Sequence, residues 1–330
     1  MCTISVLIPA KNVEAYISEC LESIIHQSFE DWEAIIVNDH SSDNTLEIID
    51  VISKHDHRII VKQNPGEGII SALRTAFKHS KGLYVTRMDA DDLMTPQKLE
   101  ILLQKLKFNG TGYIAIGLVK YFSKVPLGEG YKKYELWLNE LTKADNNFED
   151  IYKECPIPSP NWLVHRSDLH LAGAFNSNIY PEDYDLAFRF RAAKLKTIGV
   201  PITTHLWRDY PSRSSRTDPH YSDNSFIKLK VSHFIKQDYK MEKTLVIWGA
   251  GKKGKKIAAA FIANQIPILW VTNNPKKIGV MINEVKLQSN SVLNKKSDAQ
   301  VIIAISQRNT QAEISAFLRN KDHIKAYYFC

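Results

Sequence analysis

The sequence GLYVTRMDADD, at residues 82–92, decides the kind of fold that this chain can adopt. An apolar run with Leu, Tyr and Val is typical of a buried strand, and this run ends in Asp89, Asp91 and Asp92. Burying unpaired carboxylates is very costly. We therefore expect them at the carboxyl end of a strand, where a divalent cation can bind them and neutralise a phosphate. A polar turn before a helix that starts at residues 95–96 is the alternative.

The composition predicts a globular protein with more than one domain. The chain has 330 residues, of which 44% are apolar and 24% are charged. No window approaches the roughly 18 apolar residues of a membrane span, and the N-terminus lacks a basic segment followed by an apolar core. We therefore expect a cytoplasmic protein. The four cysteines are too scattered for a CxxC pair, which argues against structural zinc.

The positive charge is concentrated in the C-terminal part of the chain. Residues 1–240 hold 29 Lys and Arg against 31 Asp and Glu, whereas residues 241–330 hold 14 against 5. This asymmetry indicates a surface that contacts an acidic partner. The partner could be the inner face of an anionic membrane, bound peripherally, a phosphorylated lipid or an acidic protein. A well-solvated lysine-rich surface explains it as well. Nucleic acid is not expected, because no motif that reads bases accompanies the charge.

Strands and helices alternate in the first ninety residues. Apolar strands are expected at residues 4–9, 32–38 and 59–61 and in the stretch quoted above, and an amphipathic helix follows each. Polar residues gather after the first, second and fourth strands. Because ligands bind at the carboxyl ends of the strands in an open parallel sheet, we expect one polar site at this edge.

Four motifs occur in order along the chain. They are SVLIPAKN at residues 5–12, IIVNDHSSDNT at 35–45, RMDADD at 87–92 and PEDYDL at 181–186. In these motifs the chain resembles, from about residue 3 to about residue 216, the family 2 glycosyltransferases, which are inverting enzymes of the GT-A fold. The resemblance implies an α/β fold with a Rossmann-like mixed sheet. It also implies transfer of a hexosyl or N-acetylhexosaminyl group from a nucleotide-diphosphate sugar, with a UDP-sugar favoured, to a hydroxyl of a glycan or lipid-linked acceptor in surface polysaccharide or glycolipid synthesis.

The resemblance also assigns donor-binding residues. In the family, the loop after the first strand lies along the base and ribose, and Asp39 matches the carboxylate that accepts a hydrogen bond from the base. A carboxylate facing a pyrimidine imide N–H makes a charge-assisted hydrogen bond, which agrees with this role. For Asp39, the alternative to base binding is capping of the next helix. For Arg74, the alternative to nucleotide binding is a solvated side chain on the helix surface. The donor-binding residues that the resemblance implies are Pro9, Ala10, Asn12, Glu14, Asp39, Arg74, Asp89 and Arg208.

Metal ligands and a catalytic base are implied in the third and fourth motifs. Asp89 and Asp91 match the residues that bind Mn²⁺ or Mg²⁺, and Asp92 lies beside them. Asp183 matches the general base, because inversion needs one carboxylate that takes the proton of the attacking hydroxyl. Glu182 is expected to orient the acceptor or to cap the helix, where acidic residues are favoured by the helix dipole alone.

The segment at residues 205–216 departs from the family pattern. Tyr210 stands where the family usually has a histidine, so metal ligation by this loop is in doubt. His205 is the nearest substitute, although a lone histidine is more often a packed residue. The three arginines of this segment are expected to grip the diphosphate, because a guanidinium matches phosphate geometry. They are Arg208, Arg213 and Arg216.

The pattern restarts after residue 242. We predict a GT-A domain at residues 1–225, a helical linker at 226–242 and a small Rossmann-like domain at 243–330. The sequence GAGKKG at residues 249–254 matches GxGxxG between a strand and a helix. The acid that would hold an adenosine ribose is missing, because the next strand ends in Asn273 and Asn274. A bound cofactor and a structural, homo-oligomerising or docking role both remain open.

Three other functions are consistent with parts of the sequence. A sugar-phosphate nucleotidyltransferase normally needs a glycine-rich loop after the first strand, and residues 9–12 lack glycine. An NAD-linked oxidoreductase would use the C-terminal GxGxxG sequence. A non-catalytic nucleotide-sugar-binding or scaffold protein would keep the nucleotide fold without turnover. The intact acids of the third and fourth motifs favour an enzyme.

Overall fold

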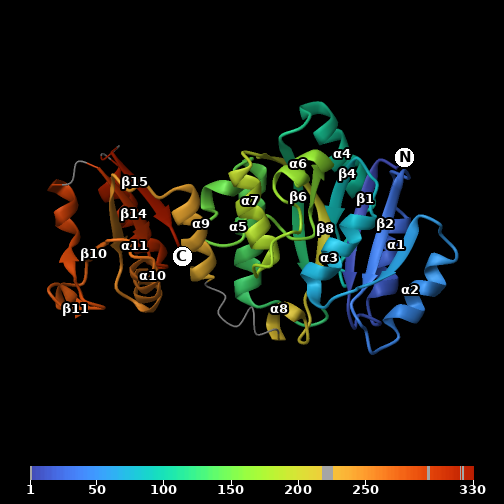
Figure 1. The fold of residues 1–330 in the computed structure, drawn as a ribbon, viewed down its shortest axis with the longest axis horizontal. Coiled ribbons are helices and arrows are strands. Elements are labelled where there is room, and N and C mark those ends of the chain that lie inside the picture. Colours follow the sequence, from blue (N-terminus) through green and yellow to red (C-terminus); the bar gives the residue numbers. More distant parts are fainter. Residues whose placement is uncertain (1, 218–225, 296–297, 320, 322) are drawn as a thin grey trace. The chain divides into compact units, whose positions relative to one another are not determined.

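The computed structural model describes the chain except residues 1, 218–225, 296–297, 320 and 322 (Figure 1). The chain forms two compact units, the first with residues 1–149 and 155–222 and the second with residues 150–154 and 223–330. The domain boundary predicted after residue 225 lies at the edge of a segment outside the described residues. The helix expected as a linker, α9 (Ile227–Gln237), lies in the second unit.

An eight-stranded mixed sheet runs through the first unit. Strands β1 to β4 are parallel, β7 is antiparallel to both of its neighbours, β6 and β8 are parallel, and β5 is antiparallel to β8. In spatial order the strands are β3 (Ile59–Gln63), β2 (Trp32–Asn38), β1 (Ile4–Ala10), β4 (Tyr84–Arg87), β7 (Trp162–His165), β6 (Tyr113–Phe122), β8 (Lys196–Arg208) and β5 (Leu93–Met94).

Helices cover this sheet and bury its faces. Val6 and Ile8 of β1 pack with Leu21 and Ile24 of the first helix in one apolar cluster. Both faces of β1 and β2 are covered, which explains their nearly continuous apolar sequences. The helices of the first unit are α1 (Ile17–Ile25), α2 (Thr45–Ser53), α3 (Gly68–His79), α4 (Lys98–Asn109), α5 (Glu129–Lys143), α6 (Arg166–Leu171), α7 (Glu182–Ala192) and α8 (Ser214–Thr217), with a 3₁₀ helix η1 (Asn147–Asp150).

The strand order places a topological switch point between β1 and β4. After β3 the chain returns to the other side of β1, so the loops that follow β1 and β4 diverge at their carboxyl ends. Gly82 lets the chain that enters β4 pass close to β1, because a Cβ atom at Gly82 would lie 2.5 Å from the backbone nitrogen of Ser5. The amide of Met88 still donates to the carbonyl of Leu7 at 2.9 Å. The acids after Met88 therefore emerge level with the end of β1.

The second unit contains a five-stranded parallel sheet. Its strands are, in spatial order, β13 (Gln288–Ser289), β10 (Leu269–Thr272), β9 (Thr244–Trp248), β14 (Ala299–Ile303) and β15 (Ile324–Tyr328). The first strand in sequence is thus central, as in doubly wound sheets. The remaining elements are α9, α10 (Lys252–Ala263), α11 (Arg308–Leu318), the hairpin β11 (Met281–Ile282) and β12 (Val285–Lys286), and the 3₁₀ helices η3 (Pro275–Lys277) and η4 (Asn290–Lys295).

Among the described residues, no helix is both long enough and apolar enough to cross a bilayer.

Candidate active site

Asp89, Asp91 and Asp92 form an acid triplet directly after β4. Each of the three carboxylates has a different protein partner. Asp89 pairs with Arg87, Asp91 with Tyr210, and Asp92 with the backbone of Arg208 and the ring of His205. The three acids therefore differ in what they can still bind.

Asp92 is sealed inside the protein. Its Oδ1 accepts from the backbone N–H of Arg208 at 2.7 Å, and its Oδ2 lies 3.0 Å from Nε2 of His205. Nδ1 of His205 lies 3.2 Å from Nζ of Lys98, which also donates to the carbonyl of Pro160 at 2.6 Å. While Lys98 is protonated it can only donate, so Nδ1 then accepts and Nε2 carries the proton shared with Asp92. His205 thus has a protein partner at each ring nitrogen, as a packed residue does.

Burial dominates the titration of this network. It raises the pKa of Asp92 to about 7 and lowers the pKa of Lys98 to about 7. It also lowers the pKa of His205 well below its usual value, with Lys98 acting in the same direction. A neutral His205 agrees with the hydrogen bonds above.

Asp91 is bonded to the residue that stands in the place of the expected histidine. The Tyr210 hydroxyl donates to Oδ2 of Asp91 at 2.8 Å, and the Tyr210 ring packs on Tyr16 with centroids 4.7 Å apart. Burial and the neighbouring Asp92 raise the pKa of Asp91 to about 6, while Arg213 acts against this rise. The protein therefore offsets the negative charge of Asp91 only in part.

Two arginines of the same segment interact with the triplet, one through a hydrogen bond and one through charge. Arg208 donates through Nε to the carbonyl of Asp91 at 2.7 Å and pairs with Glu19 at 2.5 Å. The buried guanidinium of Arg213 lies 5.3 Å from the ring centroid of Trp207. Burial opposes its charge, but Asp92 and Asp91 raise the pKa of Arg213 above its usual value. Arg208 is thus committed to the protein, whereas Arg213 faces the acids through charge.

Arg216 pairs with Asp209 through two hydrogen bonds of 3.0 and 2.8 Å. Arg216 is therefore engaged by Asp209, whereas the charge of Arg213 interacts with Asp92 and Asp91 of the acid triplet.

Arg87 joins the acid triplet to helix α7. Its Nε and Nη2 lie 2.9 and 2.8 Å from Oδ1 of Asp89, and its Nη1 lies 2.8 Å from Oε1 of Glu182. The Arg87 side chain is 6% exposed and that of Glu182 is 8% exposed, so little water screens the pair. Carboxylates of the third and fourth sequence motifs thus share one guanidinium.

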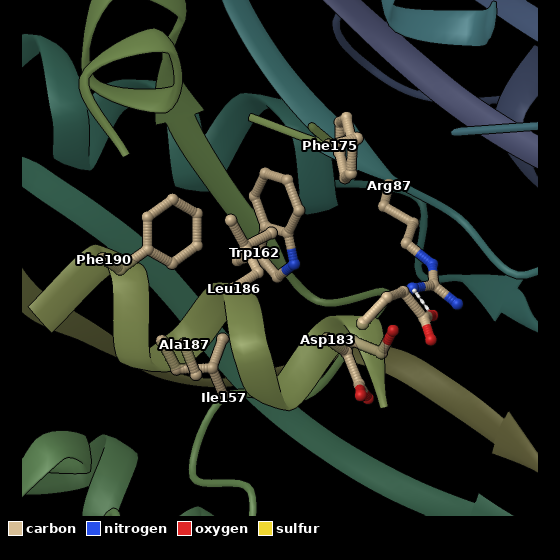
Figure 2. Close-up of a pocket in the computed structure, with 10 residues that line it drawn as sticks. Arg87, Ile157, Trp162, Phe175, Asp183, Leu186, Ala187 and Phe190 are labelled. Carbon is tan, nitrogen blue, oxygen red and sulfur yellow. Dashed lines mark hydrogen bonds and ion pairs between the residues drawn. The ribbon is translucent and has the colours of Figure 1, made fainter. Parts of the chain in front are cut away.

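A hollow lies beside this bridge, and we refer to it as the α7 hollow (Figure 2). Figure 2 shows the indole of Trp162 above the first turns of α7, with Arg87 on the side of Asp183. The hollow has a mostly apolar wall and a few polar groups. Its lining residues are Arg87, Ile157, Ser159, Trp162, Phe175, Glu182, Asp183, Leu186, Ala187 and Phe190.

Asp183 lies at the polar end of the α7 hollow. Its Oδ1 accepts from the backbone N–H of Tyr184 at 2.7 Å. Burial and the negative charge of Glu182 raise the pKa of Asp183 to about 7, and Arg87 opposes this rise. A carboxylate with a pKa near the working pH is suited to accept a proton during a reaction.

Asp39 lies after β2 with its carboxylate buried, and it does not cap the next helix. Nδ2 of Asn64 donates to its Oδ1 at 2.5 Å, the amide of Gly68 lies 3.1 Å from both oxygens, and Nζ of Lys11 lies 3.4 Å from Oδ2. Gly68 is the first residue of α3, and a Cβ atom there would lie 3.1 Å from the Tyr180 hydroxyl. Asp39 thus bonds the first residue of α3, and the Tyr180 hydroxyl lies close to that residue.

The loop after β1 is attached to the loop after β2. Oδ1 of Asn12 accepts from the amide of Ser42 at 2.8 Å, and Oε2 of Glu14 accepts from the amide of Asn44 at 2.9 Å. These side chains shape the loop from within. Pro9 and Ala10 form the end of β1, and Ala10 is buried.

Arg74 spans from α3 to the segment before α7. Its guanidinium donates to the carbonyls of Phe175 and Asn176, both at 3.2 Å, and to Oδ1 of Asn178 at 2.8 Å. The contacts place Arg74 as a support of the segment that carries Phe175, one wall of the α7 hollow.

Two acids of the triplet suit a cation that arrives with phosphate. Asp89 and Asp91 each use one oxygen for a protein partner, and no side chain of the described residues bonds the other oxygen. Within the described part of the chain there is no group of three His, Cys, Asp or Glu side chains that could hold a metal alone. Mg²⁺ in nucleotide sites is commonly held by one or two carboxylates and the phosphates. Mn²⁺ or Mg²⁺ therefore fits Asp89 and Asp91 together with a diphosphate.

One glycine of the GAGKKG sequence has a packing role. A Cβ atom at Gly254 would lie 2.1 Å from the carbonyl oxygen of Gly249, so this glycine lets α10 approach the strand. Oδ1 of Asn273 accepts from Nε1 of Trp248 at 2.7 Å, and Lys277 donates to the carbonyl of Ala250 at 2.9 Å. The expected strand, loop and helix are all present.

Several residues of the site escaped the sequence analysis. The sequence motifs predicted no role for Arg87. The contact between Lys98 and His205 joins positions far apart in the chain. Ser159 lies in a proline-rich loop whose composition indicates only rigidity. A local signal existed for Arg87 alone, because a charged residue inside a buried strand needs a partner.

Comparison with known proteins places this geometry in a family. The model for glycosyl transferase family 2 matches residues 5–171. An uncharacterized glycosyltransferase of Haemophilus influenzae is 36% identical over 236 residues, which cover 69% of this chain and 72% of that protein. Glycosyltransferase GlyG of Streptococcus pneumoniae is 36% identical over 223 residues, which cover 65% of this chain and 73% of GlyG. The chondroitin synthase of Pasteurella multocida is 37% identical over 102 residues, which cover 31% of this chain but only 11% of the synthase.

Solved structures share the fold. TarS 1–349 of S. aureus in complex with UDP-GlcNAc has a TM-score of 0.55 at 16% identity, covering 79% of this chain and 71% of that one. The mannosyltransferase PcManGT of Pyrobaculum calidifontis, with GDP-Man and Mn²⁺, has a TM-score of 0.53 at 18% identity, covering 78% and 69%. The predicted fold class is therefore confirmed. The chain is a glycosyltransferase of the GT-A fold and belongs to glycosyl transferase family 2.

Proposed function

We propose that this protein is an inverting glycosyltransferase that moves a sugar from a UDP-sugar to a hydroxyl of a glycan or lipid-linked acceptor. The observation that carries the proposal is the Arg87 bridge, which brings Asp89 and the Glu182-Asp183 pair to one place. Asp89 can then serve the metal and the leaving diphosphate, while Asp183 serves as the base for the attacking hydroxyl. The similarity to a chondroitin synthase supports a polysaccharide or glycolipid product.

Asp183 acts as the general base. It takes the proton of the acceptor hydroxyl while the hydroxyl oxygen forms a bond to the anomeric carbon of the donor sugar. The bond between that carbon and the diphosphate oxygen breaks on the opposite face, so the configuration inverts and the nucleoside diphosphate leaves. The pKa of Asp183, raised by burial to about 7, suits this proton transfer near neutral pH.

The acid triplet serves the leaving group. Asp89 and Asp91 would hold Mn²⁺ or Mg²⁺, which when bound offsets the negative charge on the departing diphosphate. Asp92 keeps the triplet in position through Arg208 and His205. Arg213 adds a positive charge that faces the same acids.

The nucleoside lies against the ends of β1 and β2. A carboxylate has about four acceptor positions, and the Asn64, Gly68 and Lys11 donors leave Asp39 capacity for the imide N–H of uracil. Pro9, Ala10, Asn12 and Glu14 form the wall along the base and ribose. Arg74 supports the segment that carries Phe175, which is a wall of the α7 hollow.

The basic C-terminal unit suits contact with an anionic membrane that carries the acceptor. Lys252, Lys253 and Lys255 are exposed in the first turns of α10. Salt-dependent co-sedimentation with anionic vesicles checks this contact. Homo-oligomerisation through this unit stays a prediction.

Titration calorimetry with UDP tests the proposal directly. We expect Mn²⁺ to raise the affinity of the wild-type protein for UDP by at least about tenfold, because the cation links the carboxylates to the diphosphate. Asp91→Ala should bind UDP equally weakly with and without Mn²⁺. Asp56→Ala, which removes an acid paired with Arg58 before β3, is the control and should keep the metal effect. A wild-type affinity that is indifferent to Mn²⁺ would contradict the proposal.

A further inference from the structure

Two polar groups that line the α7 hollow are buried and lack a partner among the described residues. The hydroxyl of Ser159 and Oε2 of Glu182 make no hydrogen bond to any residue that the structure describes. Ser159 is 6% exposed and Glu182 is 7% exposed. Both residues line the same hollow. Unpaired buried polar groups are rare in folded proteins and call for an explanation, such as an absent ligand.

The surroundings of Ser159 make a packing accident a poor explanation. Lys98 holds the carbonyl of Pro160, and Nδ2 of Asn161 donates to the carbonyl of Gly117 at 2.7 Å. Oδ1 of Asn161 accepts from the Thr204 hydroxyl at 2.7 Å. The residues that follow Ser159 are therefore bonded on several sides, and the loop presents the Ser159 hydroxyl from a held backbone.

The position of Glu182 is fixed in the same way. Its Oε1 is bonded to Arg87, which is itself held by Asp89, so the carboxylate has little freedom to turn. Oε2 can only accept a hydrogen bond, so the ligand must donate one there. The Ser159 hydroxyl can donate, so the ligand can offer an acceptor there.

The remaining lining of the hollow is apolar. Trp162, Phe175 and Leu186 are 2%, 5% and 4% exposed. Figure 2 shows Trp162 and Phe175 near the Arg87 side, with Leu186 on α7. Two sugar hydroxyls would also satisfy the polar pair, with ring C–H groups of the sugar against these side chains. An acetamido group has one N–H donor, one carbonyl acceptor and one methyl group.

We propose that the α7 hollow binds the acetamido group of an N-acetylhexosamine. Glu182 accepts from the amide N–H, Ser159 donates to the amide carbonyl, and the methyl group lies against the apolar wall. This inference rests on the proposed function, because it assigns the sugar that the same site selects. The acetamido group belongs either to the donor sugar or to the acceptor sugar, and the experiment separates these two sources.

The first arm of the test measures donor binding by the full-length protein. Calorimetry with Mn²⁺ compares UDP, UDP-glucose and UDP-N-acetylglucosamine. We expect UDP-N-acetylglucosamine to bind at least about tenfold more tightly than UDP-glucose, because a buried polar pair discriminates strongly against a ligand that leaves it unpaired. Ser159→Ala should reduce this ratio by about three- to tenfold and leave the UDP affinity unchanged.

If Ser159 had a structural role, Ser159→Ala would lower the melting temperature. Since the hydroxyl has no partner among the described residues, we expect Ser159→Ala to leave the melting temperature unchanged or to raise it. Ser80→Ala is the matched control, because that buried hydroxyl donates to the carbonyl of Phe77 at 2.7 Å outside the hollow. It should lower the melting temperature and keep the donor ratio. Glu182→Gln should also reduce the ratio, because its amide nitrogen would face the ligand N–H.

The second arm examines the acceptor. With UDP and Mn²⁺ present, methyl N-acetyl-β-glucosaminide is compared with methyl β-glucoside. Preference for the N-acetylated glycoside, lost in Ser159→Ala, supports the inference with the acceptor as the source of the acetamido group. If UDP binds but neither arm shows an N-acetyl preference, the inference is overturned while the proposed function stands. If UDP itself does not bind, the proposed function fails.

Discussion

The acid triplet and the α7 hollow share one sheet edge, yet the protein treats their polar groups in opposite ways. In the triplet, both oxygens of Asp92 and one oxygen each of Asp89 and Asp91 have protein partners. In the hollow, the Ser159 hydroxyl and Oε2 of Glu182 have none among the described residues. Arg87 is the side chain that joins the two regions.

This difference shows what each region is built to receive. A cation and a diphosphate bring strong charge interactions, so acids that are held in place by the protein still bind them well. A sugar brings only neutral hydrogen-bonding groups, whose binding is favourable when the protein groups have no competing partner. The triplet is therefore held by the protein, and the hollow keeps open positions.

The largest expected effect separates chemistry from binding. Asp183→Asn keeps the shape of the hollow but cannot accept the hydroxyl proton, so we expect kcat to fall by about 10²- to 10⁴-fold. UDP-sugar affinity, measured by calorimetry, should change by less than about threefold. Asp185→Asn, which weakens an ion pair of 2.7 Å with Arg189 on the same helix, controls for damage to α7. Unchanged turnover in Asp183→Asn would remove this residue from the mechanism.

The next effect tests the link between the two regions. Arg87→Met leaves Asp89 and Glu182 without their shared cation, and loss of one partner of a buried ion pair typically costs about 3–5 kcal/mol. The free energy of unfolding, measured with urea, should fall by about this amount. Lys11→Met is the control, because Lys11 is 55% exposed and its pair with Asp39 spans 3.4 Å, so we expect a loss below about 1 kcal/mol. Equal losses in the two variants would contradict a special role of Arg87.

The smallest effect concerns the charge that the triplet leaves uncompensated. Folding raises the pKa of Asp91 to about 6 by burial and by the nearby Asp92. Between the usual Asp pKa and pH 6 the folded protein keeps this proton and the unfolded chain loses it, so this acid lowers stability as pH rises. Without metal, Asp91→Asn should match the wild type near pH 4 and be more stable by about 1–2 kcal/mol above pH 6.

Asp43→Asn provides a control of opposite sign. Burial would raise the pKa of Asp43, but hydrogen bonds from Thr45 and Glu14 lower it below its usual value. Asp43 therefore stabilises the folded state at pH values above the usual Asp pKa, and the Asn variant should be less stable at neutral pH. A pH-independent difference between Asp91→Asn and the wild type would refute a buried, uncompensated charge.

Much of the site was predictable because its signals are local. The apolar run before the acid triplet predicted β4, and Glu182-Asp183 at a helix start predicted the first turn of α7. The family resemblance set Asp92 apart from the two metal-binding acids, but the sequence did not predict its partners. All three are aspartates in one loop, and only the return of β8 past that loop gives Asp92 its partners His205 and Arg208.

The sequence by itself determined the order of strands and helices, the acids at the end of β4 and the membership in a glycosyltransferase family. Hydrophobic periodicity and short motifs carry that information, and both act over a few residues. The tertiary structure decided which oxygen is bonded and which stays open. Arg87 reaches Glu182 and Tyr210 reaches Asp91, whereas Ser159 has no partner in the part of the chain that the structure describes. Such contacts join distant positions of the chain, and only the packing of the folded sheet and helices brings these positions together.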